Sequence, residues 1–217
     1  MRRLPVYLVL DVSYSMMGEA LEAVKVGVQS LVTALRQDPH ALETVYLSVV
    51  TFGGEAKQLM PLTELPLFNA PQLEANGATP LGEALRVTAD AIGTEVQRNS
   101  GGAKGDWKPM IFLMTDGLPT DDWESQLERF RALKTGVVVA CAAGSGADTD
   151  VLKRITESVI SLDTADSQSI GAFFKWVSAS VTANSIQLEK TGERDTADKG
   201  FGGGQLPPPP PEINLVG

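Results

Sequence analysis

The chain alternates short apolar runs with longer segments of helical periodicity, and this alternation constrains its fold more than any other feature. The first run, from Val6 to Leu10, is continuously apolar. Similar runs recur at 44–52, 110–114, 137–142 and 159–162. Continuous apolar runs of this length are typical of strands that are buried on both faces of a parallel sheet. The sequence therefore predicts a buried core of parallel strands.

Amphipathic helices are predicted between these strands. In the first, apolar residues recur on one stripe from Leu21 to Leu35, and Asp38-Pro39 ends the pattern. Comparable stripes occupy 81–96, 123–130, 151–155 and 170–181. The run at 57–62 follows the second strand through Gly53-Gly54 and alternates in polarity, which favours an antiparallel edge strand. The order β-α-β-β-α-β-α-β-α-β-α predicts an α/β fold. Its sheet is doubly wound and mostly parallel, with one antiparallel edge strand and helices on both faces.

The chain is predicted to hold one large domain and a short appendage. Its 217 residues fit this organisation, and the composition changes after Thr182. We expect a domain over 1–183 and a flexible tail over 184–217, where Gly202-Gly203-Gly204 precede the prolines of 207–211. Such a tail would be dispensable for the fold. The alternative is that residues 212–216 add as a strand to an exposed sheet edge.

Charge and composition exclude several classes of partner and compartment. The net charge of −9 disfavours attraction to nucleic acid or to an anionic membrane. No run approaches the roughly 18–20 apolar residues of a membrane span, and the run after Arg2-Arg3 ends without a small-residue cleavage site. The single cysteine, Cys141, lies in an apolar run and is expected to be a buried thiol. We expect a cytoplasmic protein.

Polar side chains with oxygen ligands follow two of the predicted strands. Asp11, Ser13 and Ser15 leave the first strand, and Asp116 leaves the strand at 110–114. Thr79 precedes the helix that leads into that strand. Open α/β sheets bind ligands outside the carboxyl ends of their strands, where the strand order reverses. If these two strands are neighbours, all five residues converge on one crevice.

The ligand set predicts the kind of ion that this crevice binds. Hydroxyl and carboxylate oxygens suit hard cations, so Mg²⁺ is expected, with Mn²⁺ or Ca²⁺ as alternatives, and Zn²⁺ and Cu²⁺ are disfavoured. Three hydroxyls and two carboxylates leave such an ion poorly neutralised. We therefore expect it to attract a carboxylate from another protein.

These motifs resemble those of the von Willebrand factor type A (vWA) domain with its metal-ion-dependent adhesion site (MIDAS). Asp11-x-Ser13-x-Ser15, Thr79 and Asp116 match the motifs of this site, and the resemblance spans about residues 4 to 183. It implies that Ser13, Ser15 and Thr79 bind the cation directly, and that Asp11 and Asp116 often act through water.

Within that family the chain most resembles the TerY-type proteins of bacterial tellurite-resistance and stress systems. The narrower match is carried by Asp-Val-Ser-Tyr-Ser-Met, Gly-Ala-Thr-Pro-Leu-Gly and Thr-Asp-Gly-Leu-Pro-Thr-Asp. It implies an adaptor linked to phosphorylation signalling, with a kinase- or phosphatase-like partner. The Cys-rich module of some TerY-type chains has no counterpart here.

Other interpretations of these residues remain open. Taken singly, Ser13 and Ser15 could be turn residues, Thr79 a helix N-cap and Asp116 part of a turn. The chain could be a metal-dependent phosphatase or other hydrolase, or a vWA partner of an AAA+ ATPase. We expect no enzymatic activity, because the motif residues leave no spare base or nucleophile beside the metal. The only histidine, His40, follows Asp38-Pro39 in a predicted loop far from the site, which argues against a Ser-His-Asp triad.

Overall fold

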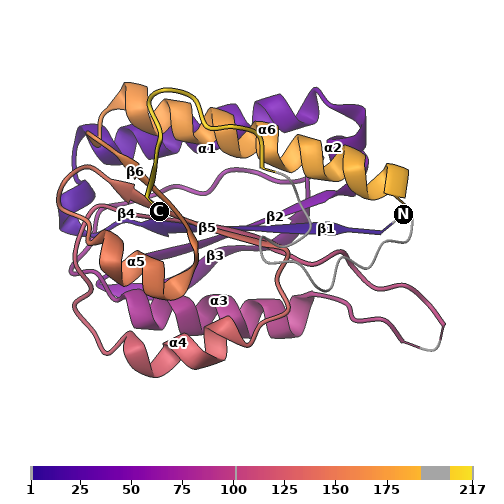
Figure 1. Ribbon diagram of the computed structural model, residues 1–217, viewed down its shortest axis with the longest axis horizontal. Helices are drawn as coiled ribbons and strands as arrows, with labels where there is room; N and C mark the ends of the chain where they lie inside the picture. The colour runs from indigo at the N-terminus through magenta and orange to yellow at the C-terminus, as the bar shows by residue number, and fades with distance from the viewer. Residues whose placement is uncertain (1, 101, 192–205, 217) are drawn as a thin grey trace.

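The computed structural model describes residues 2–100, 102–191 and 206–216 and is built on one central sheet (Figure 1). Its seven strands lie in the order β3-β2-β1-β4-β5-β6-β7. The strands are β1 Leu4–Asp11, β2 Val45–Gly53, β3 Glu55–Glu64, β4 Met110–Thr115, β5 Val137–Ala143, β6 Ser158–Leu162 and β7 Asn214–Val216. β1, β2, β4, β5 and β6 are parallel to their neighbours within this set.

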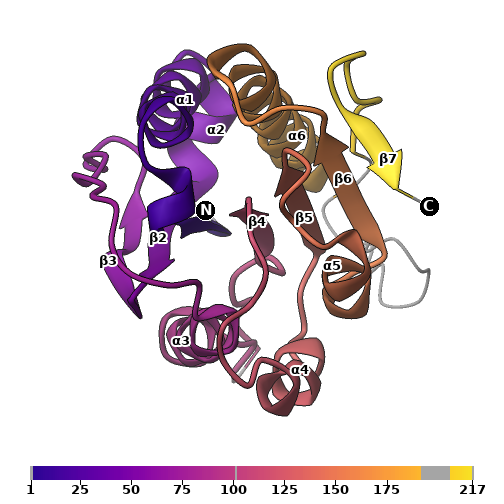
Figure 2. The same ribbon diagram turned by 90° about the vertical axis from the view of Figure 1, so that its left-hand side faces the viewer.

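Helices cover both faces of the sheet (Figure 2). The helices are α1 Glu19–Arg36, α2 Pro39–Thr44, α3 Leu81–Glu95, α4 Glu124–Arg131, α5 Thr149–Ile155 and α6 Ser167–Thr191. A short 3₁₀ helix, η1, spans Tyr14–Met16. α1, α2 and α6 lie on one face, and α3, α4 and α5 lie on the other.

β1 shows why this sequence forms a sheet with two covered faces. All eight of its residues are buried. Val6 and Leu8 pack into the core under α1 and α6, whereas Tyr7 and Val9 pack into the core against α3. Successive side chains of a strand point to opposite faces, so a strand between two helical layers needs apolar residues at nearly every position.

The strand order reverses beside β1, and this position brings the candidate site together. β1 pairs in parallel with β2 on one side and with β4 on the other. The two strands that precede Ser13 and Asp116 are therefore neighbours, and their carboxyl ends meet at the same edge of the sheet. This is the condition on which the predicted convergence depended.

The predicted fold class is confirmed. β3 follows β2 through Gly54 and is antiparallel to it, at one edge of the sheet, as expected. The other edge holds β7, which is antiparallel to β6 and was not expected as part of the domain.

The structure differs from the expected flexible tail over 184–217. α6 continues to Thr191, and Asn184 and Ser185 on it are buried. Asn184 donates from its side-chain amide to the Ser180 carbonyl, and the Ser185 hydroxyl lies 2.8 Å from that of Thr44. Hydrogen bonds of this kind allow polar side chains to be buried. The polar residues at 184–185 therefore looked like the start of a tail in the sequence, although they belong to α6. Residues 192–205, which include Gly202-Gly203-Gly204, lie outside the described residues.

The last described residues are part of the folded domain. The Trp176 indole N–H donates to the Pro207 carbonyl at 2.9 Å, and Ile213 is buried. β7 then extends the sheet beside β6 (Figure 1). Residues 214–216 thus add as a strand to a sheet edge, and that edge belongs to the chain's own sheet.

Asp38-Pro39 was predicted to end the first helix and to be followed by a loop, but a second helix follows it. The Asp38 carboxylate accepts a hydrogen bond from the Ala41 N–H, and Pro39 occupies the first turn of α2. The same pair of residues therefore ends α1 and begins α2. His40 lies within α2 rather than in a loop.

Candidate metal centre

Asp11, the last residue of β1, ties two loops of the site together. One carboxylate oxygen accepts the Ser13 backbone N–H at 2.8 Å, and the other accepts the Thr115 hydroxyl at 2.5 Å. Thr115 ends β4, so Asp11 joins the carboxyl ends of neighbouring strands. Burial raises the pKa of the Asp11 carboxyl above its ordinary value, against the lowering effect of the hydrogen bonds from Ser13 and Thr115.

Ser13, Ser15 and Asp116 form a chain of hydrogen bonds. The Ser15 hydroxyl donates to Asp116 Oδ1 at 2.6 Å, and the Ser13 and Ser15 hydroxyl oxygens lie 2.9 Å apart. A hydroxyl has one hydrogen, so Ser13 is the donor to Ser15. Because of η1, Ser15 is exposed at the surface while Ser13 is buried.

Asp116 begins the loop after β4 and is partly buried. Burial raises the pKa of its carboxyl above the ordinary value, and the hydrogen bond from Ser15 opposes that rise. Gly117 follows it. A methyl group placed on Gly117 would lie 3.6 Å from both Ser15 Oγ and Thr79 Oγ1. The two hydroxyls therefore face one point beside Gly117, and the absent side chain leaves that point open.

Thr79 is not the N-cap of α3, which corrects the capping interpretation of this residue. The residue preceding α3 is Pro80, and the cap position forms no side-chain hydrogen bond. Instead, the Asp121 carboxylate accepts the backbone N–H groups of Gly82 and Glu83, each at 2.9 Å. The Thr79 side chain is buried and its hydroxyl is left to the site.

Three glycines hold the loops in place by allowing close backbone contact. The Gly54 N–H donates to the Ala78 carbonyl, and the Tyr14 N–H donates to the Gly77 carbonyl. Gly77 has φ +55°, and a Cβ there would lie 2.4 Å from the Gly54 Cα. At Gly53, a Cβ would lie 2.6 Å from the Val12 carbonyl oxygen. Larger residues would push the Thr79 loop away from the loop after β1.

The structure thus brings together all five residues singled out in the sequence. Sequence reasoning missed two supporting residues, Thr115 and Asp121. Both lie in the Thr-Asp-Gly-Leu-Pro-Thr-Asp segment, which begins with Thr115 and ends with Asp121. Nothing in the local sequence indicated that the Asp121 carboxylate reaches back to α3.

The donor set fits a hard divalent cation. All five side chains offer oxygen, and hydroxyls outnumber carboxylates. Within the described ranges no group of three His, Cys, Asp or Glu side chains forms an alternative metal site. A nearby cation would favour the ionised form of both carboxyls.

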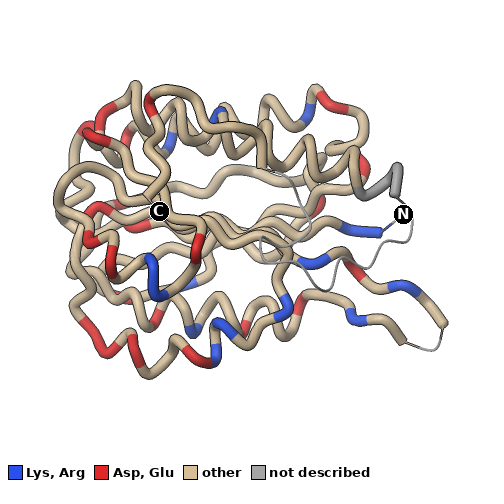
Figure 3. The backbone as a smooth tube through the Cα atoms, viewed as in Figure 1, with Lys and Arg blue, Asp and Glu red and all other residues tan. Residues whose placement is uncertain are grey.

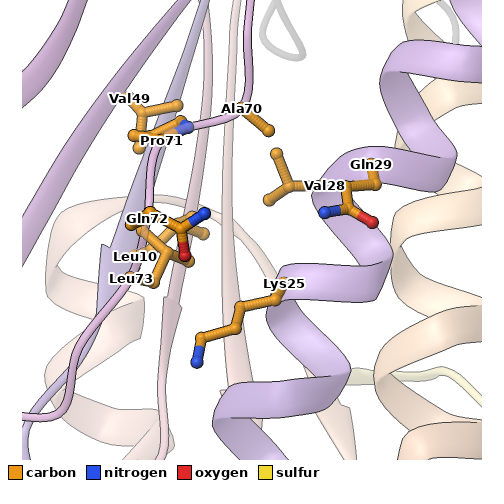
Figure 4. Close-up of a pocket in the computed structure, with 9 residues that line it drawn as sticks. All are labelled: Leu10, Lys25, Val28, Gln29, Val49, Ala70, Pro71, Gln72 and Leu73. Atoms are coloured by element: carbon orange, nitrogen blue, oxygen red, sulfur yellow. The ribbon is translucent and has the colours of Figure 1, made fainter.

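A small cavity lies elsewhere in the molecule (Figure 4). It has a volume of about 40 Å³ and lies between α1 and the segment 70–73, with Lys25 and Gln29 on the helix side and Leu10 beneath. Substrate pockets are usually about 300–1,000 Å³. This cavity has room for little more than water and contains none of the five residues. Among the residues that the structure describes, no helix is long and apolar enough to cross a membrane.

Solved structures of similar fold include proteins of several kinds. A von Willebrand factor type A protein from Catenulispora acidiphila is similar with a TM-score of 0.63 at 16% identity, over 84% of this chain and 43% of that one. The pilus adhesin SpaC from Lactobacillus rhamnosus GG gives 0.65 at 14%, over 85% and 31%. Proximal thread matrix protein 1 from the mussel byssus, in a structure with a zinc-occupied MIDAS motif, gives 0.60 at 18%, over 83% and 48%.

These structures establish a shared fold, and this chain spans less than half the length of each of them. No curated protein matches the chain in sequence. The model of the von Willebrand factor type A domain family, however, matches residues 6–175, which is most of the chain. The chain therefore belongs to the von Willebrand factor type A domain family.

Proposed function

We propose that this chain is a protein-docking domain that depends on a divalent cation. Domains of this family are protein-interaction modules, and some carry a metal site. One observation carries the proposal. The end of β1, the loops after β1 and β4 and the loop before α3 bring five oxygen-bearing side chains together at the strand-order reversal.

Each of the five residues has a proposed role. Ser13, Ser15 and Thr79 hold the cation through their hydroxyls, and Asp11 and Asp116 orient the loop and balance charge. Asp11 does so through the hydrogen bonds from Ser13 and Thr115 described above. Asp116 is positioned by the hydroxyl of Ser15.

Mg²⁺ is the proposed ion, because Mg²⁺ prefers oxygen ligands and retains open or water-filled positions. When bound, it supplies a positive centre that accepts one carboxylate from another protein. Mn²⁺ and Ca²⁺ are alternatives. The zinc in the mussel protein's MIDAS motif makes Zn²⁺ a necessary competitor in any test, although the ligand preferences disfavour it.

The biological role we propose is that of an adaptor in a bacterial tellurite-resistance or stress-response complex, in the cytoplasm. The sequence matches to TerY-type proteins at 11–16, 77–82 and 115–121 support it. The partner would be kinase- or phosphatase-like, which links the domain to phosphorylation signalling.

We also propose that the isolated chain has no catalytic activity. The Cys141 thiol is buried, and burial raises its pKa well above the ordinary range, so it is a poor nucleophile. His40 lies on α2, at the end of the molecule opposite the site (Figure 1). A phosphoester hydrolysis rate that is lost in Ser13→Ala would instead support the hydrolase alternative.

Calorimetric titration with Mg²⁺ and with Mn²⁺, each alone and in competition with Zn²⁺, tests the site. Wild-type protein is expected to bind one ion. Thr79→Ala removes a proposed direct ligand. Loss of even an outer-shell partner usually lowers metal affinity by about tenfold or more, so the affinity of Thr79→Ala for the ion should fall at least about tenfold. Thr79→Ser keeps the hydroxyl and should bind nearly as well. Because Thr79 does not cap α3, Thr79→Ala should also unfold at nearly the wild-type denaturant concentration. Unchanged ion affinity in Thr79→Ala would contradict the assignment.

A capture experiment tests docking. Partners retained by immobilised protein in Mg²⁺ should be released by EDTA and should not be retained by Ser13→Ala. Ser30→Ala, which removes an exposed hydroxyl on α1, is the matched control and should retain them. Retention that is equal in EDTA would rule out the metal-dependent function. A ring ATPase among the partners would support the alternative role beside an AAA+ ATPase.

A further inference from the structure

Three large apolar side chains flank the proposed metal-binding residues in the sequence and are exposed to solvent. Tyr14 is 61% exposed, Met17 68% and Leu118 59%. Each lies within two residues of Ser15 or Asp116. We call these three side chains the apolar rim. Single exposed apolar residues are common on protein surfaces, but a group around a polar site is typical of an interaction surface.

The apolar rim is held on ordered backbone. The Tyr14 N–H donates to the Gly77 carbonyl at 3.0 Å, and the Met17 N–H donates to the Tyr14 carbonyl at 3.1 Å. Met16, between them in the sequence, is fully buried and anchors η1. On the other side, the Thr120 N–H donates to the Thr79 carbonyl at 2.9 Å, which fixes the loop that carries Leu118. A backbone that is already held in place reduces the conformational entropy that these loops lose on binding.

The surface around the apolar rim is acidic. Acidic residues gather at the end of the molecule where the parallel strands terminate (Figure 3). Asp122 and Glu19 are exposed, and the whole chain has a net charge of −9. This field opposes the approach of a polyanionic segment. A cation held by the hydroxyls would attract one carboxylate of a partner. The acidic surface around the cation would repel further acidic residues on either side of that carboxylate.

We propose that the apolar rim selects a protein partner whose docking loop carries a single carboxylate flanked by large apolar side chains. The proposal rests on the proposed metal-dependent function and adds the chemistry of the partner segment. The carboxylate meets the cation, and its apolar neighbours cover Tyr14, Met17 and Leu118. Apolar area that leaves the solvent on both sides then strengthens binding.

Fluorescence anisotropy with three labelled peptides tests this selection in Mg²⁺. The peptides are Gly-Phe-Asp-Leu-Gly, Gly-Ser-Asp-Ser-Gly and Gly-Glu-Asp-Glu-Gly, each with blocked ends. The apolar-flanked peptide is expected to bind at least about tenfold more tightly than the serine-flanked one, which corresponds to about 1.4 kcal/mol. The acid-flanked peptide is expected to bind most weakly.

A variant of the apolar rim separates selective binding of the apolar-flanked peptide from nonspecific hydrophobic binding. Met17→Ser combined with Leu118→Ser should reduce the affinity for the apolar-flanked peptide to that for the serine-flanked peptide, whose own affinity should stay unchanged. Leu67→Ser is the matched control, because Leu67 is 65% exposed and follows β3 at the opposite end of the sheet. It should leave the affinities for all three peptides unchanged.

The outcomes distinguish this inference from the function on which it rests. Equal affinity for apolar- and serine-flanked peptides, no binding of any peptide, or an equal loss of both peptides in the rim variant would overturn the inference. Peptide binding that persists in EDTA would overturn the metal-dependent function itself.

Discussion

At the scale of single residues, Asp121 connects the candidate site to the rest of the fold. Its carboxylate accepts two backbone N–H groups at the start of α3, a position where a negative charge also interacts favourably with the helix dipole. Thr79 lies two residues before that helix begins at Leu81. One carboxylate from the loop after β4 therefore fixes the position of a hydroxyl on a different loop.

Removing this carboxylate should lower both stability and ion affinity. Asp121→Ala is expected to lower the free energy of unfolding by about 0.5–2 kcal/mol, the usual effect of losing a helix cap. Urea denaturation in metal-free buffer measures this. The Mn²⁺ affinity should fall as well, because the Thr79 loop loses its anchor. Asp121→Asn keeps one acceptor oxygen and should lose less stability.

Asp122→Ala is the matched control for this prediction. Asp122 is exposed, and among the described residues its carboxylate accepts only a long 3.4 Å hydrogen bond from the Ser125 N–H. Its removal should change the free energy of unfolding by less than about 0.5 kcal/mol, as for ordinary surface substitutions. Similar losses in Asp121→Ala and Asp122→Ala would show that Asp121 acts through surface charge alone.

At the scale of secondary-structure elements, the site depends on how closely three loops approach one another. The strands set the direction of each loop, but the glycines set the spacing. Backbone contacts from the loop before α3 reach both the β2–β3 turn and the loop after β1. Backbone contacts therefore set the spacing of these loops, and the side-chain hydrogen bonds of Asp11 and Ser15 complete the arrangement.

Gly77→Ala tests this backbone packing. The positive φ alone costs an L-residue roughly 1–2 kcal/mol, and the 2.4 Å approach to Gly54 adds steric repulsion. We expect a loss of stability above 1–2 kcal/mol on that basis, measured by urea denaturation, together with weaker ion binding. Gly93→Ala is the control, because Gly93 lies in α3 with open space around it. That variant should be about 0.5–1 kcal/mol more stable. A Gly77→Ala protein as stable as the wild type would disprove this account of the loops.

At the scale of the whole molecule, the C-terminal segment completes the sheet. β7 covers the outer edge of β6, and Ile213 fills a place in the core beside α6. Exposed sheet edges are prone to pairing with other chains, so a covered edge also limits aggregation. The segment thus contributes to the domain although its prolines resemble a linker.

Deleting residues 206–217 should therefore destabilise the domain. Burial of an isoleucine contributes about 1.5–3 kcal/mol, and 1 kcal/mol shifts Tm by about 2–4 °C in a chain of this size. We expect a fall in Tm of roughly 5–10 °C by differential scanning calorimetry. Ile213→Ser in the full chain should produce much of this fall. Leu215→Ser should produce almost none, since Leu215 is 67% exposed. An unchanged Tm after deletion would return the segment to the role of a dispensable tail.

The sequence alone predicted the fold class, most of the elements and the residue types gathered at the candidate site. Apolar runs such as Val6 to Leu10 can be satisfied only between two covering layers, so periodicity was enough to predict the α/β sheet. The type of metal ligand was also predictable, because hydroxyls and carboxylates that follow two strand ends in the combination Asp11-x-Ser13-x-Ser15, Thr79 and Asp116 indicate a site for a hard cation. The placement of Ser13 and Asp116 at one sheet edge also required β1 and β4 to be neighbours, which the structure decided.

Only the tertiary structure decided which polar groups support that site and where the domain ends. Asp121 lies 39 residues from Gly82 in the chain, and its role depends on how two loops meet. Asn184, Ser185 and Ile213 look like parts of a polar tail, yet burial and hydrogen bonding make them part of the domain. Local sequence reports the preferences of neighbouring residues. It does not report contacts between distant segments, and those contacts determine whether a polar side chain is solvated, capped or buried.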